Sequence, residues 1–212
     1  LKALSIALAF LILIPATMVC AEKSLIFYIL DGSGSMWGRV DGKLKIQAAK
    51  EAMTTLLKET PDEVQCGVMV YGHRRKGDCS DIEMIVPIGK LKKEEAISRI
   101  KGITPKGKTP ISDSIAMAID HVKKSECVST IVLVSDGIET CGKDPCGMTR
   151  SLKESGINFV MHVVGFDVEE KAAKQLSCIA QAGAGLYFST SNATDLLAAM
   201  NRIKESVVKK EK

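Results

Sequence analysis

The sequence lacks the residue patterns of several common kinds of site. It has no C-x-x-C pair, and its three histidines, His73, His121 and His162, lie far apart in the chain. A zinc site built from cysteine and histidine is therefore not expected. The nucleophile-elbow string G-x-S-x-G is also absent. Asp31-x-Ser33 lacks the second carboxylate of an aspartyl phosphatase loop. Because these patterns are absent, no residue in them indicates an enzyme.

No apolar run reaches the roughly 20 residues that a membrane-spanning helix needs. The longest, residues 3–14, follows Lys2 and precedes a stretch of small residues that ends at Ala21. A basic residue, a short apolar core and a small residue at the cleavage point are typical of a secretory signal peptide. We expect cleavage after Ala21 and no stable membrane insertion of the remaining chain. A lipid anchor on Cys20 is the alternative, which the bulky valine before that cysteine disfavours.

The chain has no strong excess of either charge, no internal repeat and no low-complexity segment. It contains 29 basic and 25 acidic residues among 212, and residues 1–21 hold one of the basic residues and no acidic one, so removing them leaves a net charge of +3. This excess is too small to indicate nucleic-acid binding. The remaining 191 residues, 22–212, suit one domain with a full hydrophobic core. Export places this expected domain in the periplasm or outside the cell.

Cysteine usage agrees with export. One of the seven cysteines, Cys20, lies in the expected signal peptide, and the other six are Cys66, Cys79, Cys127, Cys141, Cys146 and Cys178. An even number of cysteines in an oxidising compartment predicts up to three disulfides, with fifteen pairings to choose from. We expect all six to be paired. A local bridge between Cys141 and Cys146 is the first candidate, since a short loop with glycine and proline separates them.

Strand and helix patterns alternate along the expected domain. Short apolar runs bounded by turn residues predict strands, and amphipathic stretches predict helices. The predicted strands are 25–30, 64–71, 82–87, 131–134, 158–165 and 185–189. The predicted helices are 43–60, 92–101, 111–124, 148–155, 168–182 and 192–209. This order predicts a doubly wound α/β domain, with a mainly parallel six-stranded sheet and helices on both faces. The link before 82–87 is too short for a helix, so this strand should be an antiparallel edge.

Two of the buried strands each deliver an aspartate to one edge of the predicted sheet. One ends in Asp31-Gly32-Ser33-Gly34-Ser35 and the other in Ser135-Asp136-Gly137. In a doubly wound sheet, ligands bind beyond the carboxyl ends of the parallel strands, where the order of connections reverses. Carboxylates and hydroxyls without histidine or cysteine favour a hard cation such as Mg²⁺, Mn²⁺ or Ca²⁺. Each Asp-Gly pair alone is also a common start of a turn.

Together with a third loop, these residues resemble the metal-ion-dependent adhesion site of von Willebrand factor type A domains. That site has the pattern D-x-S-x-S after the first strand, a threonine in a G-x-T-P-like loop and an aspartate in S-D-G. The chain fills these positions with Asp31, Ser33, Ser35, Thr109 and Asp136. The resemblance implies a Mg²⁺ held by the three hydroxyls, with the two carboxylates acting directly or through water. It also implies that an open coordination position accepts a carboxylate from a partner, either a protein or another carboxylate-bearing ligand.

Thr109 has two other interpretations. A threonine followed by Pro110 at a helix start is the pattern of an N-cap, which stabilises a helix by about 1 kcal/mol without a metal. Residues 102–109 also match the phosphate-loop string G-x-x-x-x-G-K-S/T, with Lys108 as its lysine. A phosphate loop follows a buried strand, whereas a charged amphipathic helix is predicted before this one. A disulfide-stapled interaction module without a cation is a further alternative.

Two features near the predicted cation site are candidates for a ligand-binding rim. The segment His73-Arg74-Arg75-Lys76 follows a parallel strand and should rise at the same edge of the sheet. Its fixed positive charges would attract an acidic partner, although an ordinary solvated hairpin tip has the same composition. Trp37, the only tryptophan, follows the metal loop. It is either an interface anchor or a side chain packed against the helix 43–60.

The exported protein should begin at Glu22, because the small residue Ala21 follows an apolar core of signal-peptide length. Intact-mass measurement of the protein recovered from outside the cytoplasm checks this prediction. A mass that includes residues 1–21, or one that includes a lipid on Cys20, contradicts it.

Overall fold

The computed structural model describes residues 24–123 and 128–209. The expected signal peptide, Cys20 and Cys127 lie outside these residues. The main sheet has six strands: β1 (Leu25–Asp31), β4 (Gln65–Tyr71), β5 (Ile82–Lys90), β6 (Ser129–Ser135), β7 (Phe159–Phe166) and β8 (Tyr187–Thr190). Their order is β5-β4-β1-β6-β7-β8, and β5 alone runs antiparallel to its neighbour. The predicted sheet and its antiparallel edge strand are confirmed.

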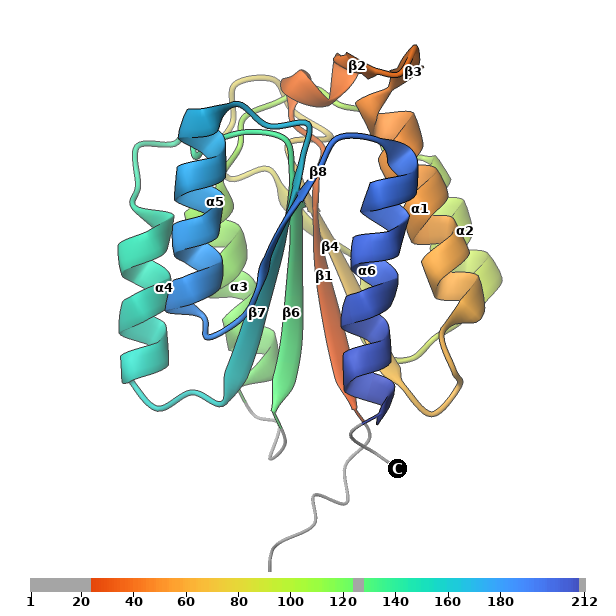
Figure 1. The fold of residues 1–212 in the computed structure, drawn as a ribbon, viewed down its shortest axis with the longest axis vertical. Coiled ribbons are helices and arrows are strands. Elements are labelled where there is room, and N and C mark those ends of the chain that lie inside the picture. The colour runs from red at the N-terminus through yellow and green to blue at the C-terminus, as the bar shows by residue number, and fades with distance from the viewer. Residues whose placement is uncertain (1–23, 124–127, 210–212) are drawn as a thin grey trace, which may run out of the picture.

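Helices cover both faces of this sheet (Figure 1). One layer contains α1 (Lys45–Glu59), α2 (Lys93–Lys101) and α6 (Ala193–Val208), and the other contains α3 (Ile111–Val122), α4 (Pro145–Glu154) and α5 (Glu170–Ala182). Each of the six predicted helices is present within a few residues of its expected bounds. The three layers give the doubly wound α/β architecture that the alternating patterns predicted.

The central strand β1 explains why the sheet needs both helical layers. All seven of its residues are buried. Because side chains alternate along a strand, Ile26, Tyr28 and Leu30 pack into the core under α1 and α6, whereas Phe27 and Ile29 pack into the core under α3 and α5. An unbroken apolar run is therefore the pattern of a strand that is covered on both sides.

The segment between β1 and α1 differs from the prediction. A helix was expected to begin at Lys43, but residues Lys43–Leu44 form strand β3, which pairs with β2 (Arg39–Val40) in a small hairpin. The two turn residues, Asp41 and Gly42, have φ angles of 49° and 77°. Positive φ at both positions is the geometry of a tight two-residue hairpin turn, for which Asp-Gly is a preferred sequence. A short 3-10 helix, η1 (Gly34–Trp37), precedes this hairpin.

The cysteines pair differently from the prediction. Among the cysteines that the structure describes, the bridges are Cys79–Cys141 and Cys146–Cys178, so the expected local bridge between Cys141 and Cys146 is wrong. Cys146 lies in the first turn of α4, which packs against α5, whereas Cys141 lies in the preceding loop beside the β4–β5 hairpin. Cys66 has a free, buried thiol in β4, so the expectation that all six cysteines are paired is also wrong.

Cys66 should resist alkylation in the native protein and react after unfolding. Its side chain is fully buried in the core that α1, α2 and α6 cover, and burial raises the pKa of its thiol to about 12. Since the thiolate is the reactive form, both access and ionisation oppose reaction. Iodoacetamide labelling with and without denaturant, followed by mass analysis of the Cys66 peptide, measures this. Rapid labelling of the folded protein at pH 8 contradicts the prediction.

Candidate metal and ligand site

The candidate site lies where the chain connections of the sheet change direction. β1 leads through α1 to β4 on one side, and its neighbour β6 leads through α4 to β7 on the other. Asp31 is the last residue of β1, and Asp136 follows the last residue of β6. The loops that follow these strands form the upper end of the molecule in Figure 1. This is the switch point at which doubly wound sheets bind their ligands.

Asp31 is held by three hydrogen bonds although it is only 1% exposed. Its Oδ2 accepts hydrogen bonds from the Tyr71 hydroxyl at 2.8 Å and the Ser135 hydroxyl at 2.6 Å, and its Oδ1 accepts one from the Ser33 backbone N–H at 2.8 Å. Buried carboxylates need such partners to remain charged. Burial and then the charge of Asp31 raise the pKa of Tyr71 well above its usual value, so Tyr71 remains a donor.

Tyr71 and Ser135 were not among the predicted site residues. Tyr71 is the register partner of Asp31 on the neighbouring parallel strand, and Ser135 ends β6. A polar atom at the carboxyl end of a strand that is otherwise apolar is the sequence signal that could have identified both.

The hydroxyls of Ser33 and Ser35 connect the loop after β1 to Asp136. The Ser33 and Ser35 hydroxyl oxygens are 3.0 Å apart, and the Ser35 hydroxyl donates to Asp136 Oδ1 at 2.6 Å. Four of the five predicted cation ligands, Asp31, Ser33, Ser35 and Asp136, therefore lie in one cluster of oxygen atoms. Their proximity brings together residues that are about 100 positions apart in the sequence.

Asp136 is the least satisfied group of this cluster. It is 7% exposed, and its Oδ2 accepts no hydrogen bond from the described residues. The nearest positive charge is the Lys45 ammonium, 3.4 Å from that oxygen. Burial and then the charge of Asp31 raise the pKa of Asp136 to about 6, against the opposing effects of Ser35 and Lys45. A buried carboxylate oxygen that accepts no hydrogen bond has the chemistry of a cation ligand.

Thr109 joins the site through backbone contacts of its loop. Gly107 pairs with Ser33 in a parallel bridge, so the loop that carries Thr109 lies along the loop after β1. The Thr109 N–H donates to the Thr140 hydroxyl at 2.7 Å, and the Thr140 N–H donates to the Thr109 carbonyl at 3.1 Å. Thr109 is thereby held between the loop of Ser33 and the loop that follows Asp136.

The N-cap interpretation of Thr109 is not supported. Helix α3 begins at Ile111, and its N-cap residue is Pro110. The carboxylate of Glu139 takes the capping role instead, because its Oε2 accepts a hydrogen bond from the Ser112 N–H at 2.8 Å. Glu139 was not among the predicted residues, because it caps a helix that precedes it by 27 positions in the sequence.

The phosphate-loop interpretation also lacks its structural context. Residues 102–109 follow helix α2, which ends at Lys101, rather than a strand of the sheet. Lys108 is exposed, and the next helix begins at Ile111, past the end of the motif. Phosphate loops need a buried strand and a helix N-terminus on either side of the string.

The expected rim lies at the predicted edge, but its charges are largely matched. Arg74 pairs with Asp81 at 2.8 Å, and Arg75 pairs with Asp78 at 3.0 Å. His73 pairs with Glu83 at 3.0 Å, and burial lowers its pKa. Acids of the same hairpin therefore offset the charges of Arg74 and Arg75. The attraction of an acidic partner to this rim stays a prediction.

Trp37 is neither fully exposed nor fully packed. The residue is 49% exposed, and its indole N–H donates to the Pro105 carbonyl at 2.9 Å. This hydrogen bond ties the 3-10 helix to the loop of Thr109. A half-exposed indole beside the cluster leaves Trp37 available to a partner.

The donor set determines which kinds of metal the site fits. No group of three or more His, Cys, Asp or Glu side chains arranged to hold a metal occurs within residues 24–123 and 128–209. The cluster instead contains two carboxylates and the hydroxyls of Ser33 and Ser35. Hydroxyl and carboxylate oxygens suit Mg²⁺, Mn²⁺ or Ca²⁺, and they fit the group that the adhesion-site pattern implies.

The sequence model of the von Willebrand factor type A domain matches residues 26–139, which include all five predicted ligand positions. The chain belongs to this family of adhesion and interaction modules. It is also similar to the Bacillus subtilis protein YwmD, with 26% identity over 204 residues that cover 89% of this chain and 90% of YwmD.

Two solved structures show the same fold at low sequence identity. The vWF domain of the type V pili tip protein Mfa5 from Porphyromonas gingivalis superposes with a TM-score of 0.69 at 13% identity, covering 88% of this chain and 95% of that one. Proximal thread matrix protein 1 from the mussel byssus, in a structure with a zinc-occupied metal-ion-dependent adhesion site (MIDAS) motif, has a TM-score of 0.62 at 20% identity. The superposition covers 87% of this chain and 46% of the mussel protein.

Replacement of Asp136 by Asn should stabilise the metal-free protein increasingly as the pH rises from about 4 to 7. The pKa of Asp136 is raised in the folded state to about 6, so between its unfolded and folded pKa the folded state binds more protons and loses stability with rising pH. The amide of the variant does not titrate, and the Ser35 hydroxyl can still donate to its carbonyl oxygen.

Urea unfolding of both proteins in chelator at several pH values measures the difference in unfolding free energy. A difference that does not change with pH contradicts the raised pKa.

Proposed function

We propose that this domain binds a divalent cation, with Mg²⁺ as the first choice, and through it a carboxylate of a protein partner outside the cytoplasm. Asp31, Ser33, Ser35, Thr109 and Asp136 would hold the cation. When bound, the cation would supply a positive centre with an open position for a carboxylate oxygen. The observation that carries this proposal is the cluster of Ser33, Ser35 and Asp136 oxygens, in which Asp136 Oδ2 accepts no hydrogen bond from the described residues.

The chain's own residues prepare this cluster before any ligand arrives. Tyr71 and Ser135 use both their hydroxyls to orient Oδ2 of Asp31, and the Ser33 N–H holds Oδ1. Of the two serines, Ser35 is accessible to solvent, whereas Ser33 is buried like Asp31. Hydroxyl ligands carry no charge, so they would leave a bound cation with more residual positive charge than carboxylate ligands would. Such a site favours an anionic partner.

The similar proteins supply independent support for a cation and for a protein partner. The mussel thread protein of the same fold holds zinc in its MIDAS motif, and the Porphyromonas gingivalis domain belongs to a pilus tip protein. Both are similar to this chain in fold at low identity, so they support the kind of site rather than a named partner or metal.

Two features support a location outside the cytoplasm. Residues 24–123 and 128–209 contain two disulfides, which form and persist in oxidising compartments. The residues 3–14 carry the expected signal-peptide pattern. Over the part of the chain that the structure describes, none of the helices has the length and apolar character to cross a membrane.

Replacement of Thr109 by Ala should weaken Mg²⁺ binding by at least about tenfold, since even partners outside the ligand set change metal affinity by that factor. The unfolding free energy of the metal-free protein should fall by less than the roughly 1 kcal/mol that a helix cap contributes, because the Thr109 hydroxyl does not cap α3. Lys108→Ala is the matched control. It removes an exposed neighbouring side chain and should leave Mg²⁺ affinity unchanged.

Calorimetric titration of wild type and both variants with Mg²⁺, and separately with ATP, measures these affinities. If Lys108→Ala abolishes ATP binding while Thr109→Ala leaves Mg²⁺ affinity unchanged, the cation site is wrong and residues 102–109 bind nucleotide.

A further inference from the structure

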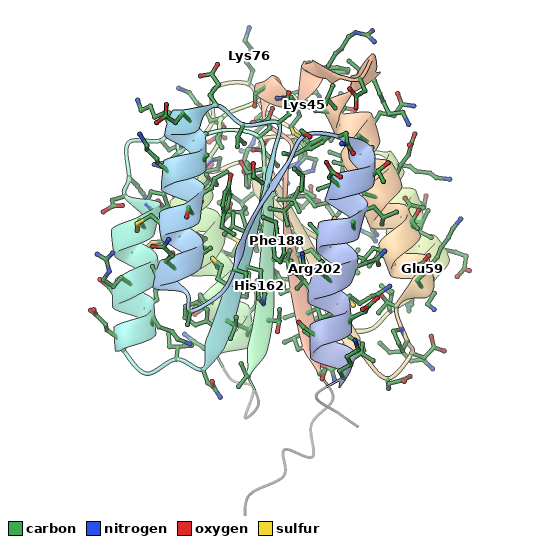
Figure 2. All side chains as sticks on the ribbon, viewed as in Figure 1. Lys45, Glu59, Lys76, His162, Phe188 and Arg202 are labelled. Atoms are coloured by element: carbon green, nitrogen blue, oxygen red, sulfur yellow. A yellow bond between two sulfur atoms is a disulfide. The ribbon has the colours of Figure 1, made fainter. Side chains whose placement is uncertain are left out.

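Lys45, the first residue of α1, is held in place at the edge of the candidate site. Its backbone N–H donates to the Gly38 carbonyl at 2.8 Å, and its aliphatic stem passes Gly38 so closely that a Cβ there would lie 3.4 Å from Lys45 Cε. Figure 2 shows Lys45 at the end of the molecule that bears the loops of the site. The side chain is 12% exposed. The segment that carries Ser35 therefore also positions the ammonium group.

The ammonium group faces two carboxylates that differ in burial. It lies 3.4 Å from Asp136 Oδ2 and 3.0 Å from Asp167 Oδ2, and it donates to the Asp167 carbonyl at 2.9 Å. The Asp136 side chain is 1% exposed, whereas that of Asp167 is 45% exposed. Water screens the charge of Asp167 more than that of Asp136. The ammonium is therefore coupled most strongly to the buried carboxylate of the candidate cation site.

A hollow of about 440 Å³ opens beside these groups. Two of the predicted cation ligands, Ser35 and Asp136, line it together with Lys45, Asp167 and Lys171. A ligand that enters this hollow meets the cation site and the ammonium group of Lys45 at once. Lys45 is thus placed to act on both the cation and the ligand.

We infer that Lys45 sets the charge balance of this site, weakening the binding of the cation and strengthening the binding of the anionic ligand. The inference rests on the proposed function. With Lys45 present, the cation-loaded site carries one positive charge more than the same site without it. Like charges repel, so the ammonium opposes the divalent cation, and the same charge attracts a carboxylate. Lys45 is a specificity-determining residue that touches Asp136, and it is not itself a cation ligand.

Opposite changes of the two affinities separate this role from a structural one. A lysine that only tied α1 to the loops after β6 and β7 would, when replaced, loosen the site and weaken both cation and ligand. Lys45→Met keeps most of the aliphatic stem and removes the charge, and Lys45→Gln is a second variant in case the first is unstable. Lys43→Met is the control, because Lys43 has the same charge two residues away and pairs with Glu51 at the solvent-exposed surface.

The experiment is a calorimetric Mg²⁺ titration of each protein, followed by an acetate titration at saturating Mg²⁺. The single tryptophan, Trp37, reports the second titration by fluorescence because it is half-exposed beside the site. For Lys45→Met and Lys45→Gln, Mg²⁺ should bind roughly tenfold more tightly and acetate roughly threefold more weakly, the size expected for one charge a few ångströms away in a water-like dielectric. Lys43→Met should change neither affinity by more than about twofold.

The outcomes distinguish the inference from the function on which it rests. Absence of Mg²⁺ binding to the wild-type protein overturns the proposed function and with it the role of Lys45. If the wild-type protein binds Mg²⁺ and acetate, but the Lys45 variants bind Mg²⁺ no more tightly than Lys43→Met does, the inference is wrong and the proposed function stands. Weaker binding of both ligands by the Lys45 variants assigns Lys45 a structural role and also overturns the inference.

Discussion

The arrangement of this domain's ligand edge depends on two carboxylates that the central strands bring together in a buried position. Asp31 ends β1 and Asp136 directly follows the neighbouring parallel strand β6, and the charge of Asp31 helps to raise the pKa of Asp136. Asp31 is stabilised by hydroxyl and backbone donors, whereas Asp136 has one serine and a lysine 3.4 Å away. The imbalance leaves Asp136 Oδ2 without a hydrogen bond from the described residues. A cation at this position would offset the repulsion that the fold creates.

Close contact between backbones makes the edge compact enough to hold such a cluster. A Cβ on Gly72 would lie 2.4 Å from the Lys108 carbonyl oxygen, and the residue has a φ of 67°. The Gly72 carbonyl also accepts hydrogen bonds from the N–H groups of Lys106 and Gly107, at 3.0 Å and 2.7 Å. Only glycine allows the hairpin loop after β4 to approach the Thr109 loop this closely. The glycine therefore contributes to the geometry of Thr109 without being a ligand.

The fold was predictable from the sequence because its signals are local. The apolar runs that became β1 and β6 and the amphipathic stretches between them indicated layers, order and the antiparallel edge. The positions of Asp31, Ser33, Ser35, Thr109 and Asp136 followed from one motif, and four of them lie in contact. The turn at Asp41 and Gly42 had a local signal that was overlooked in favour of the helix pattern beginning at Lys43.

Several features that sequence reasoning missed depend on distant parts of the chain. Glu139 caps a helix that precedes it by 27 residues, and Tyr71 reaches Asp31 from the neighbouring strand. The pairing of Arg74 with Asp81 and of Arg75 with Asp78 is local by contrast, because all four residues lie in the same hairpin. The disulfides could not be chosen from spacing, since Cys79 and Cys141 are 62 residues apart. For Glu139, Tyr71 and the disulfides, the partner is fixed by the packing of loops and strands and not by sequence proximity.

The Cys79–Cys141 bridge shows what these distant contacts do together. It joins the β4–β5 hairpin loop to the loop that follows Asp136, and Thr140, next to Cys141, is hydrogen-bonded to the loop of Thr109. By a chain-entropy estimate, closing a loop of this length stabilises the fold by about 4 kcal/mol. The loops that bear the candidate ligands are thus tied to one another by covalent and hydrogen bonds before anything binds. A ligand would therefore need to order little of these loops when it binds. Its affinity should then depend on charge more than on loop closure.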